Sequence, residues 1–314
     1  MTARAGGGRR ALAGASVAVL FIFTMLALGG GTAAAGGRWL EPVSAREAGG
    51  FWTPARTRAA KPLELVPPRF GPRAASAPVD EPVFGSNFEL VADPTEPQFR
   101  IHGAFFVAGF FGTGLCSGTS VKAPNESVVI TAAHCLDGIG RRSRSVFIPA
   151  YRYGQRPFGV FPVRWVDTTN QWRGIFESAN FDVGAFVVGR NHRGETLFDA
   201  VGGAEIAWNL KAKQTFDVHG YPGEEPFDGE TQRLCREVPF LGHDPTSFAF
   251  PGPLNLANDC DVTGGASGGG WMIRGGTTLN SVTSYGYFDI ESPVFGPYFG
   301  KEAARLYQRA ARVG

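Results

Sequence analysis

Three short segments of this chain place a histidine, an aspartate and a serine in one order. His134 lies in residues 131–135 (TAAHC), Asp182 lies near the start of an apolar run, and Ser267 lies in residues 265–269 (GASGG). A serine hydroxyl is a weak nucleophile at neutral pH, so it needs a general base to take its proton and a carboxylate to hold that base. Together the three segments predict such a constellation.

The same order excludes the nucleophile elbow of the α/β-hydrolases. Residues 265–269 match its Gly-x-Ser-x-Gly pattern, but that fold needs the catalytic histidine after the serine. All five histidines of this chain precede Ser267, namely His102, His134, His192, His219 and His243. The order Asp, His, Ser would need other residues that lack such sequence contexts.

The alternation of short apolar runs with turn-forming residues predicts an all-β domain. From Phe99 onward, short apolar runs alternate with Gly, Pro, Asn and Asp, and the chain contains 44 glycines. This pattern is typical of many short strands, which are predicted at residues 128–130, 181–188, 215–219 and 280–285. It fits two six-stranded antiparallel β-barrels, at about residues 99–200 and 201–299, with the motifs at strand ends and loops.

The end of the chain predicts one helix. Apolar residues recur at helical spacing between residues 302 and 313, namely Ala303, Leu306, Ala310 and Val313. They form a single apolar stripe, so we expect this C-terminal helix to pack on the protein.

At these residues the chain resembles the trypsin/chymotrypsin-like serine peptidases, and within them the bacterial branch that includes the glutamyl endopeptidases. The resemblance covers roughly residues 99–312, within a catalytic domain at 96–314. It rests on the segments CSGT (116–119), TAAHC (131–135), VHGYPG (218–223) and CDVTGGASG (260–268). It implies a chymotrypsin-like fold whose C-terminal helix packs on the second barrel.

The chemistry assigns a role to each of the three residues. Ser267 is the predicted nucleophile, and the backbone N–H groups of Gly265 and Ser267 are the predicted oxyanion hole. His134 is the general base, and Asp182 fixes its tautomer. Two other carboxylates compete with Asp182, but neither precedes a comparable apolar run: Asp167 and Asp199.

Substrate recognition is predicted less directly. Ser284, Tyr285 and Gly286 resemble the segment whose backbone pairs with the substrate, although an ordinary strand ending in glycine reads the same. Asp261 lies six residues before Ser267, where the resemblance places a pocket-base residue that favours Arg or Lys.

Three departures from the family pattern limit what can be carried over. Ala266 stands where the family has an aspartate that pairs with a freed N-terminal amine, so that activation route is in doubt. Gly270 replaces a common proline. No histidine follows His243, so glutamate specificity is unsupported.

The N-terminus predicts export. A basic start, an apolar run over residues 11–28 and small residues ending at Ala35 predict a secretory signal peptide at 1–35, with an uncleaved membrane anchor as the alternative. Residues 36–95 are rich in Pro, Arg and Gly, which predicts a propeptide or linker largely without a packed core. Prolines interrupt regular structure there, at residues 62, 67–68, 72 and 78.

The cysteines agree with export. The chain has four cysteines, an even number, and in an exported protein they predict two disulfides. A zinc site is the alternative use, but the chain has no Cys-x-x-Cys pair. The family resemblance implies the pair Cys116–Cys135 and, with it, Cys235–Cys260.

These observations predict a secreted serine endopeptidase that acts as a monomer on protein or peptide substrates. The chemistry needs no metal and no organic cofactor. A net charge of only +2 gives no sign of a nucleic-acid partner, and a membrane is expected only if the leader stays attached. The alternatives are a secreted binding protein of the same fold with weak turnover, and an esterase that uses the same three residues.

Overall fold

The computed structural model describes residues 36–63, 87–110, 112–287 and 293–314. All of them belong to one compact unit, residues 33–314. The predicted signal peptide and the prolines at 67–68, 72 and 78 lie outside the described residues. Within the described ranges, no helix is long and apolar enough to cross a membrane.

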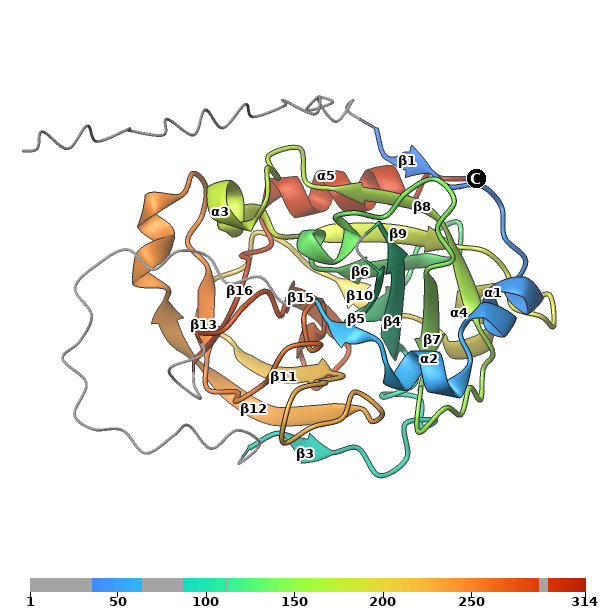
Figure 1. The fold of residues 1–314 in the computed structure, drawn as a ribbon. Helices are drawn as coiled ribbons and strands as arrows, with labels where there is room; N and C mark the ends of the chain where they lie inside the picture. The colour runs from blue at the N-terminus through green and yellow to red at the C-terminus, as the bar shows by residue number, and fades with distance from the viewer. Residues whose placement is uncertain (1–35, 64–86, 111, 288–292) are drawn as a thin grey trace, which may run out of the picture. The chain divides into compact units, whose positions relative to one another are not determined.

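The first sheet closes into a six-stranded antiparallel barrel (Figure 1). The strands run in the order β8-β7-β4-β5-β6-β9, and β9 pairs back onto β8 to complete the circle. Aromatic rings fill the interior, with Phe105 stacked on Phe186 at 4.3 Å between centroids. The strands are β4 (His102–Gly109), β5 (Gly112–Val121), β6 (Val128–Thr131), β7 (Val146–Pro149), β8 (Phe161–Thr168) and β9 (Gly184–Val188).

The second sheet has six central antiparallel strands in the order β15-β14-β11-β12-β13-β16. A bridge between Tyr285 and Phe295 brings the chain after β15 beside β16. The central strands are β11 (Thr215–Gly220), β12 (Arg233–His243), β13 (Leu256–Asn258), β14 (Gly270–Ile273), β15 (Thr278–Val282) and β16 (Val294–Gly296). Two short strands extend the sheet, β3 (Glu89–Leu90) on β12 and β10 (Glu205–Ile206) on β15. The predicted all-β class is confirmed.

Two predicted strands have different bounds in the structure. The segment predicted at 181–188 begins as strand β9 only at Gly184, because a 3-10 turn, η2 (Ala179–Phe181), precedes it and Asp182 turns inward. The segment predicted at 280–285 is β15, which ends at Val282. The remaining turns and helices are η1 (Ala133–Leu136), α3 (Ile175–Ser178), α4 (Leu197–Val201) and η3 (Pro245–Ala249).

The C-terminal helix α5 (Lys301–Ala310) forms as predicted, with Ala303, Leu306 and Ala310 buried. Its expected placement on the second barrel is wrong in part. The helix contacts β8 and β9 of the first barrel, and its apolar stripe joins a cluster drawn from both sheets. Arg309 adds a charged hydrogen bond of 2.6 Å to Asp167 on β8, which joins the helix to the first barrel.

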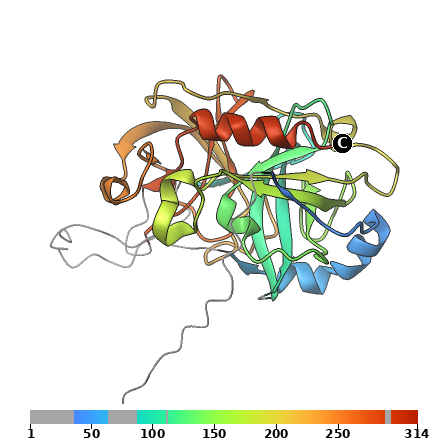
Figure 2. The same ribbon diagram turned by 90° about the horizontal axis from the view of Figure 1, so that it is seen from above.

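Residues 36–63 pack against the first barrel, unlike the expectation of little packed core (Figures 1 and 2). They form β1 (Arg38–Trp39), α1 (Ala45–Phe51), α2 (Pro54–Arg58) and β2 (Lys61–Pro62). Ser44 and Thr53 cap the two helices by accepting from backbone N–H groups. Local composition could not show this order, because the apolar side chains of the segment are buried on a surface that the distant barrel supplies.

Candidate active site

His134 lies on η1, directly after strand β6, and is 3% exposed. Its backbone N–H donates to Oδ1 of Asp182 at 2.9 Å, and its ring Nδ1 lies 2.7 Å from Oδ2. A carboxylate only accepts hydrogen bonds, so Nδ1 carries a proton. Asp182 therefore holds both the backbone and the ring of His134.

Asp182 is fully buried and receives a third hydrogen bond. The hydroxyl of Ser284 donates to Oδ2 at 2.5 Å. Three donors on one buried carboxylate offset much of the cost of removing its charge from water. The competing aspartates have structural partners instead, since Asp167 binds Arg309 and Asp199 forms a capping box with Thr196 on α4.

The pKa of His134 is raised above its ordinary value of 6.5. Burial lowers this pKa, but the charge of Asp182 and its hydrogen bond outweigh the effect of burial, with smaller contributions from Asp137 and from a bond to the Leu63 carbonyl. Burial also raises the pKa of Asp137 to about 6, although Trp172 donates to its carboxyl group. The raised pKa means that the imidazole of His134 takes up a second proton more readily than a free histidine does.

Ser267 lies in the turn before β14 and is 3% exposed. Gly265 and Gly268 flank it at φ +95° and +81°, and a Cβ on Gly268 would lie 2.0 Å from Thr131 Oγ1. Only glycine fits there, because both the conformation and the space exclude a side chain. Ser117 on β5 anchors the turn by donating from its backbone N–H to the Ser267 carbonyl and from its hydroxyl to the Gly265 carbonyl.

Ser267 and His134 are not hydrogen-bonded to each other among the described residues. The Ser267 hydroxyl instead faces the Ser284 carbonyl at 3.5 Å, and Nε2 of His134 lies 3.2 Å from the Leu63 carbonyl oxygen. Leu63 follows β2 in the N-terminal segment. Sequence reasoning missed both Leu63 and Ser117, although Ser117 stands in the quoted CSGT segment.

The structure forms the disulfides Cys116–Cys135 and Cys235–Cys260, the pairing that the resemblance implied. The first lies next to His134, and its sulfurs are the only cysteine atoms near that ring in the part of the chain described here. Because both sulfurs are already bonded to each other, they offer no thiolate to a metal ion.

Comparison with known proteins identifies the family. A protease, Anisep, from Arthrobacter nicotinovorans is 32% identical over 70% of this chain and 99% of its own, with a TM-score of 0.61. A thermostable serine protease, AL20, from an extremophilic microorganism is 33% identical over 68% of this chain and 98% of its own, also at 0.61. The chain belongs to the trypsin/chymotrypsin-like serine proteases.

Support for the glutamyl-endopeptidase branch is weak by comparison. A Glu endopeptidase structure shares the fold with a TM-score of 0.53 over 73% of this chain and 98% of its own, but at 16% identity. No family model and no curated protein matches the chain. The first two proteases leave nearly a third of this chain without a counterpart.

In this member of the family, the predicted substrate-pairing segment is hydrogen-bonded to a buried carboxylate. Asp244 on the β12–η3 connection accepts hydrogen bonds from the hydroxyls of Tyr285, at 2.6 Å, and Tyr287, at 2.9 Å. Asn255 also binds the Tyr285 hydroxyl. Backbone hydrogen bonds to Phe295 also hold the chain at Ser284 and Tyr285.

Asp261 is buried and linked to the start of the second described range. Its carboxylate accepts from the Asn87 backbone N–H at 3.3 Å and 3.4 Å, and its own N–H donates to the Asn87 side chain at 3.1 Å. The Asp261 side chain is therefore hydrogen-bonded to Asn87, which directly precedes the segment that enters β3.

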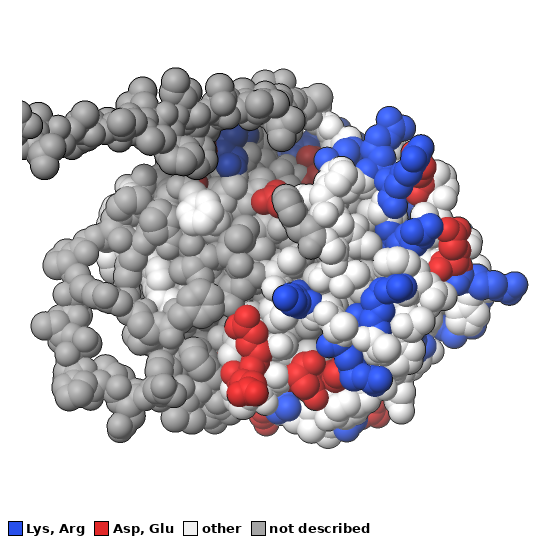
Figure 3. Space-filling model, viewed as in Figure 1, with Lys and Arg blue, Asp and Glu red and all other residues white. Residues whose placement is uncertain are grey.

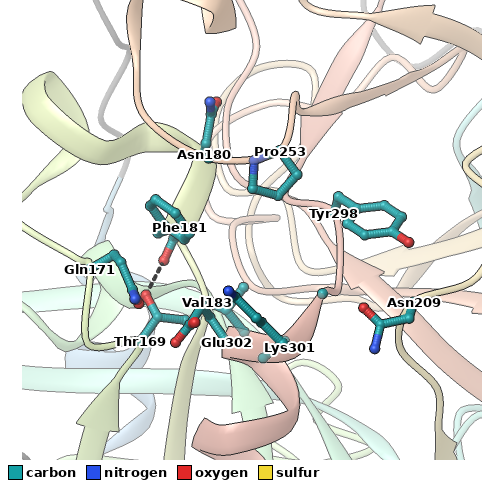
Figure 4. A pocket seen from close by; sticks show the side chains of 13 residues that line it. Thr169, Gln171, Asn180, Phe181, Val183, Asn209, Pro253, Tyr298, Lys301 and Glu302 are labelled. Atoms are coloured by element: carbon teal, nitrogen blue, oxygen red, sulfur yellow. Dashed lines mark hydrogen bonds between the residues drawn. The ribbon is translucent and has the colours of Figure 1, made fainter.

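A cavity of ≈ 420 Å³ lies apart from His134 and Ser267, neither of which lines it. Figure 4 shows its side chains coming from the Thr169–Val183 region, from Pro253 and from the start of α5. Thr169 closes one wall by donating to the Phe181 carbonyl at 2.7 Å. The cavity thus adjoins the segment that carries Asp182, through Phe181 and Val183.

Proposed function

We propose that the chain is an exported serine endopeptidase that hydrolyses peptide bonds through an acyl-enzyme on Ser267. The observation that carries this proposal is the buried pair of His134 and Asp182, joined through both the backbone and the ring of the histidine. In a chain of the serine protease family, this arrangement supplies an oriented base beside the serine of the glycine-rich turn.

The reaction follows from these groups. Neutral His134 takes the proton from the Ser267 hydroxyl through Nε2, and the oxygen attacks the substrate carbonyl. The backbone N–H groups of Gly265 and Ser267 stabilise the oxyanion that forms. His134 then gives its proton to the leaving amine, and water releases the acyl group by the same route.

The substrate is a protein or peptide that adds an extended strand beside Ser284, Tyr285 and Gly286. A preference for Arg or Lys at the cleaved bond is proposed from the position of Asp261, six residues before Ser267. Two disulfides support an exported location, with residues 1–35 as the leader and a monomer as the working form.

The test is labelling with a fluorophosphonate probe, followed by mass spectrometry of the modified peptide. Two forms are labelled, the intact chain and a chain from which residues 36–63 have been removed. Ser267→Ala is the control. Adduct at Ser267 that disappears in the control supports the proposal, and a peptide panel then separates peptidase from esterase activity. Ester hydrolysis without cleavage of any peptide favours the esterase, and no labelling of either form favours the binding protein.

A further inference from the structure

The first barrel has a surface that residues 36–63 of the same chain fill. Trp52 is fully buried there, with its ring 5.3 Å from Phe106, and its Nε1 donates to the Arg144 carbonyl at 2.6 Å. The cluster around it also includes Ala48 and Tyr151. Full burial of a tryptophan gives a strong anchor, since aromatic side chains dominate the energetics of such interfaces.

Hydrogen bonds continue this interface on both sides of Trp52. The hydroxyls of Tyr151 and Thr57 are hydrogen-bonded at 3.0 Å, and Arg156 donates to the Gly49 carbonyl at 3.0 Å. Strand β1 extends the first sheet by antiparallel pairing with β8. Charges of both signs lie side by side on the described surface (Figure 3), and two exposed ion pairs join segment to barrel, Arg142–Glu41 and Arg144–Glu47.

The segment then leads directly to the catalytic base. Strand β2 pairs in parallel with β5, and the Leu63 N–H donates to the Leu115 carbonyl at 2.9 Å. The Leu63 side chain covers Gly114 so closely that a Cβ there would lie 2.5 Å from it. This pairing delivers the Leu63 carbonyl oxygen to within 3.2 Å of Nε2 of His134.

The arrangement is unproductive for catalysis in two ways. The Leu63 carbonyl oxygen faces Nε2 of His134, the atom that has to take the proton of Ser267. In addition, both ring nitrogens of His134 face hydrogen-bond acceptors, Nδ1 the Asp182 carboxylate and Nε2 the Leu63 carbonyl. A ring that donates a hydrogen bond to each acceptor carries a proton on both nitrogens. A doubly protonated histidine cannot accept the proton of Ser267.

We propose that residues 36–63 are a built-in inhibitor, docked on the first barrel through Trp52 and blocking the base of His134 through the Leu63 carbonyl. This inference rests on the proposed peptidase function and adds its regulation. Activation then consists of detaching the segment. Ala266 fits this route, because it is fully buried and lacks the carboxylate that would pair with a freed N-terminus.

The experiment compares the rate of fluorophosphonate labelling at Ser267 in the intact full-length protein and in three variants of it. Leu63→Pro removes the N–H that binds Leu115, and Trp52→Ala removes the anchor. Arg46→Gln, an exposed position on α1, is the matched control. Hydrogen exchange of residues 36–63 and of the two sheets shows whether the segment detaches while the sheets stay folded.

We expect the intact protein and Arg46→Gln to label slowly, and both other variants to label about tenfold faster or more with fast exchange confined to the segment. Leu63→Pro keeps the test decisive if Trp52→Ala disturbs the barrel. Equal labelling rates with the segment attached and detached would overturn the inhibitory role and leave the peptidase proposal standing. No labelling of any form, with the segment shown to be detached, would overturn both.

Discussion

The Ser284 hydroxyl donates to Oδ2 of Asp182 at 2.5 Å, so the segment that is proposed to bind substrate also holds the carboxylate that orients His134. The same residue accepts from Ser267 through its carbonyl at 3.5 Å. Ser284, which follows strand β15, thus contacts both the proposed orienting carboxylate and the proposed nucleophile. All kinetic outcomes below apply to the Leu63→Pro background, in which the base is released.

Replacing Ser284 with alanine is expected to lower kcat roughly 10- to 100-fold with little change in KM. The buried carboxylate loses one hydrogen bond to a charged group, worth about 1.5–3 kcal/mol. Ser281→Ala is the control, because it removes a buried serine hydroxyl that donates to the Pro297 backbone carbonyl and not to the Asp182 carboxylate. Steady-state kinetics decide the matter, and an effect confined to KM would contradict the assigned role.

Asp182→Asn is expected to lower kcat by about 10⁴-fold, because the amide holds His134 in the wrong tautomer. Asp199→Asn should keep full activity, since Asp199 only caps helix α4. Both variants are compared by steady-state kinetics at equal concentrations of folded protein. Comparable losses in the two would show that the aspartate was assigned wrongly.

The activity should fall on the acid side through a pKa above 6.5. Burial lowers the pKa of His134, but Asp182 raises it by more, with Asp137 contributing in the same direction. Only neutral His134 acts as a base, so a raised pKa moves the acid limb of kcat/KM to higher pH. The pH profile of kcat/KM measures it, and a midpoint below the ordinary histidine value would refute the assignment.

Acid should unfold the protein through two stacked histidines at the junction of the sheets. His102 and His219 stack at 3.8 Å, and burial lowers the pKa of His219 to about 3. The unfolded chain binds more protons between pH 6.5 and 3, so the free energy of unfolding falls as pH falls through this window.

His219→Phe keeps a ring in this stack and removes one titrating group. Its free energy of unfolding should decline less between pH 7 and 4, as urea denaturation would show. His192→Gln, at an exposed position, should behave like the parent protein. Parallel decline in His219→Phe and the parent would rule out this origin of acid sensitivity.

Gly265→Ala should lower kcat by about 10²–10³-fold by displacing an oxyanion-hole donor. The residue has φ +95°, and a Cβ would lie 2.7 Å from the Tyr221 carbonyl oxygen. Gly174→Ala is the matched control, since Gly174 has φ +100° and open space around its Cβ position. If the control loses as much activity, general backbone strain rather than the oxyanion hole accounts for the loss.

The sequence by itself determined the all-β class and the C-terminal helix, and it predicted His134, Asp182 and Ser267 as the candidate site without Leu63 and Ser117. These features are visible locally, because strand periodicity and the contexts of His134, Asp182 and Ser267 occupy a few consecutive residues each. The resemblance to serine peptidases added a disulfide pairing that the structure contains.

Only the tertiary structure decided where residues 36–63 lie and what they touch. The prolines and arginines of that segment predict a linker. The packing partners of Trp52 and Leu63 come from strands far away in the chain, so the local sequence does not show them. The same holds for the position of α5 between the sheets and for the His102–His219 stack. Burial against a distant surface leaves no local periodicity, so these contacts exist only in the folded chain.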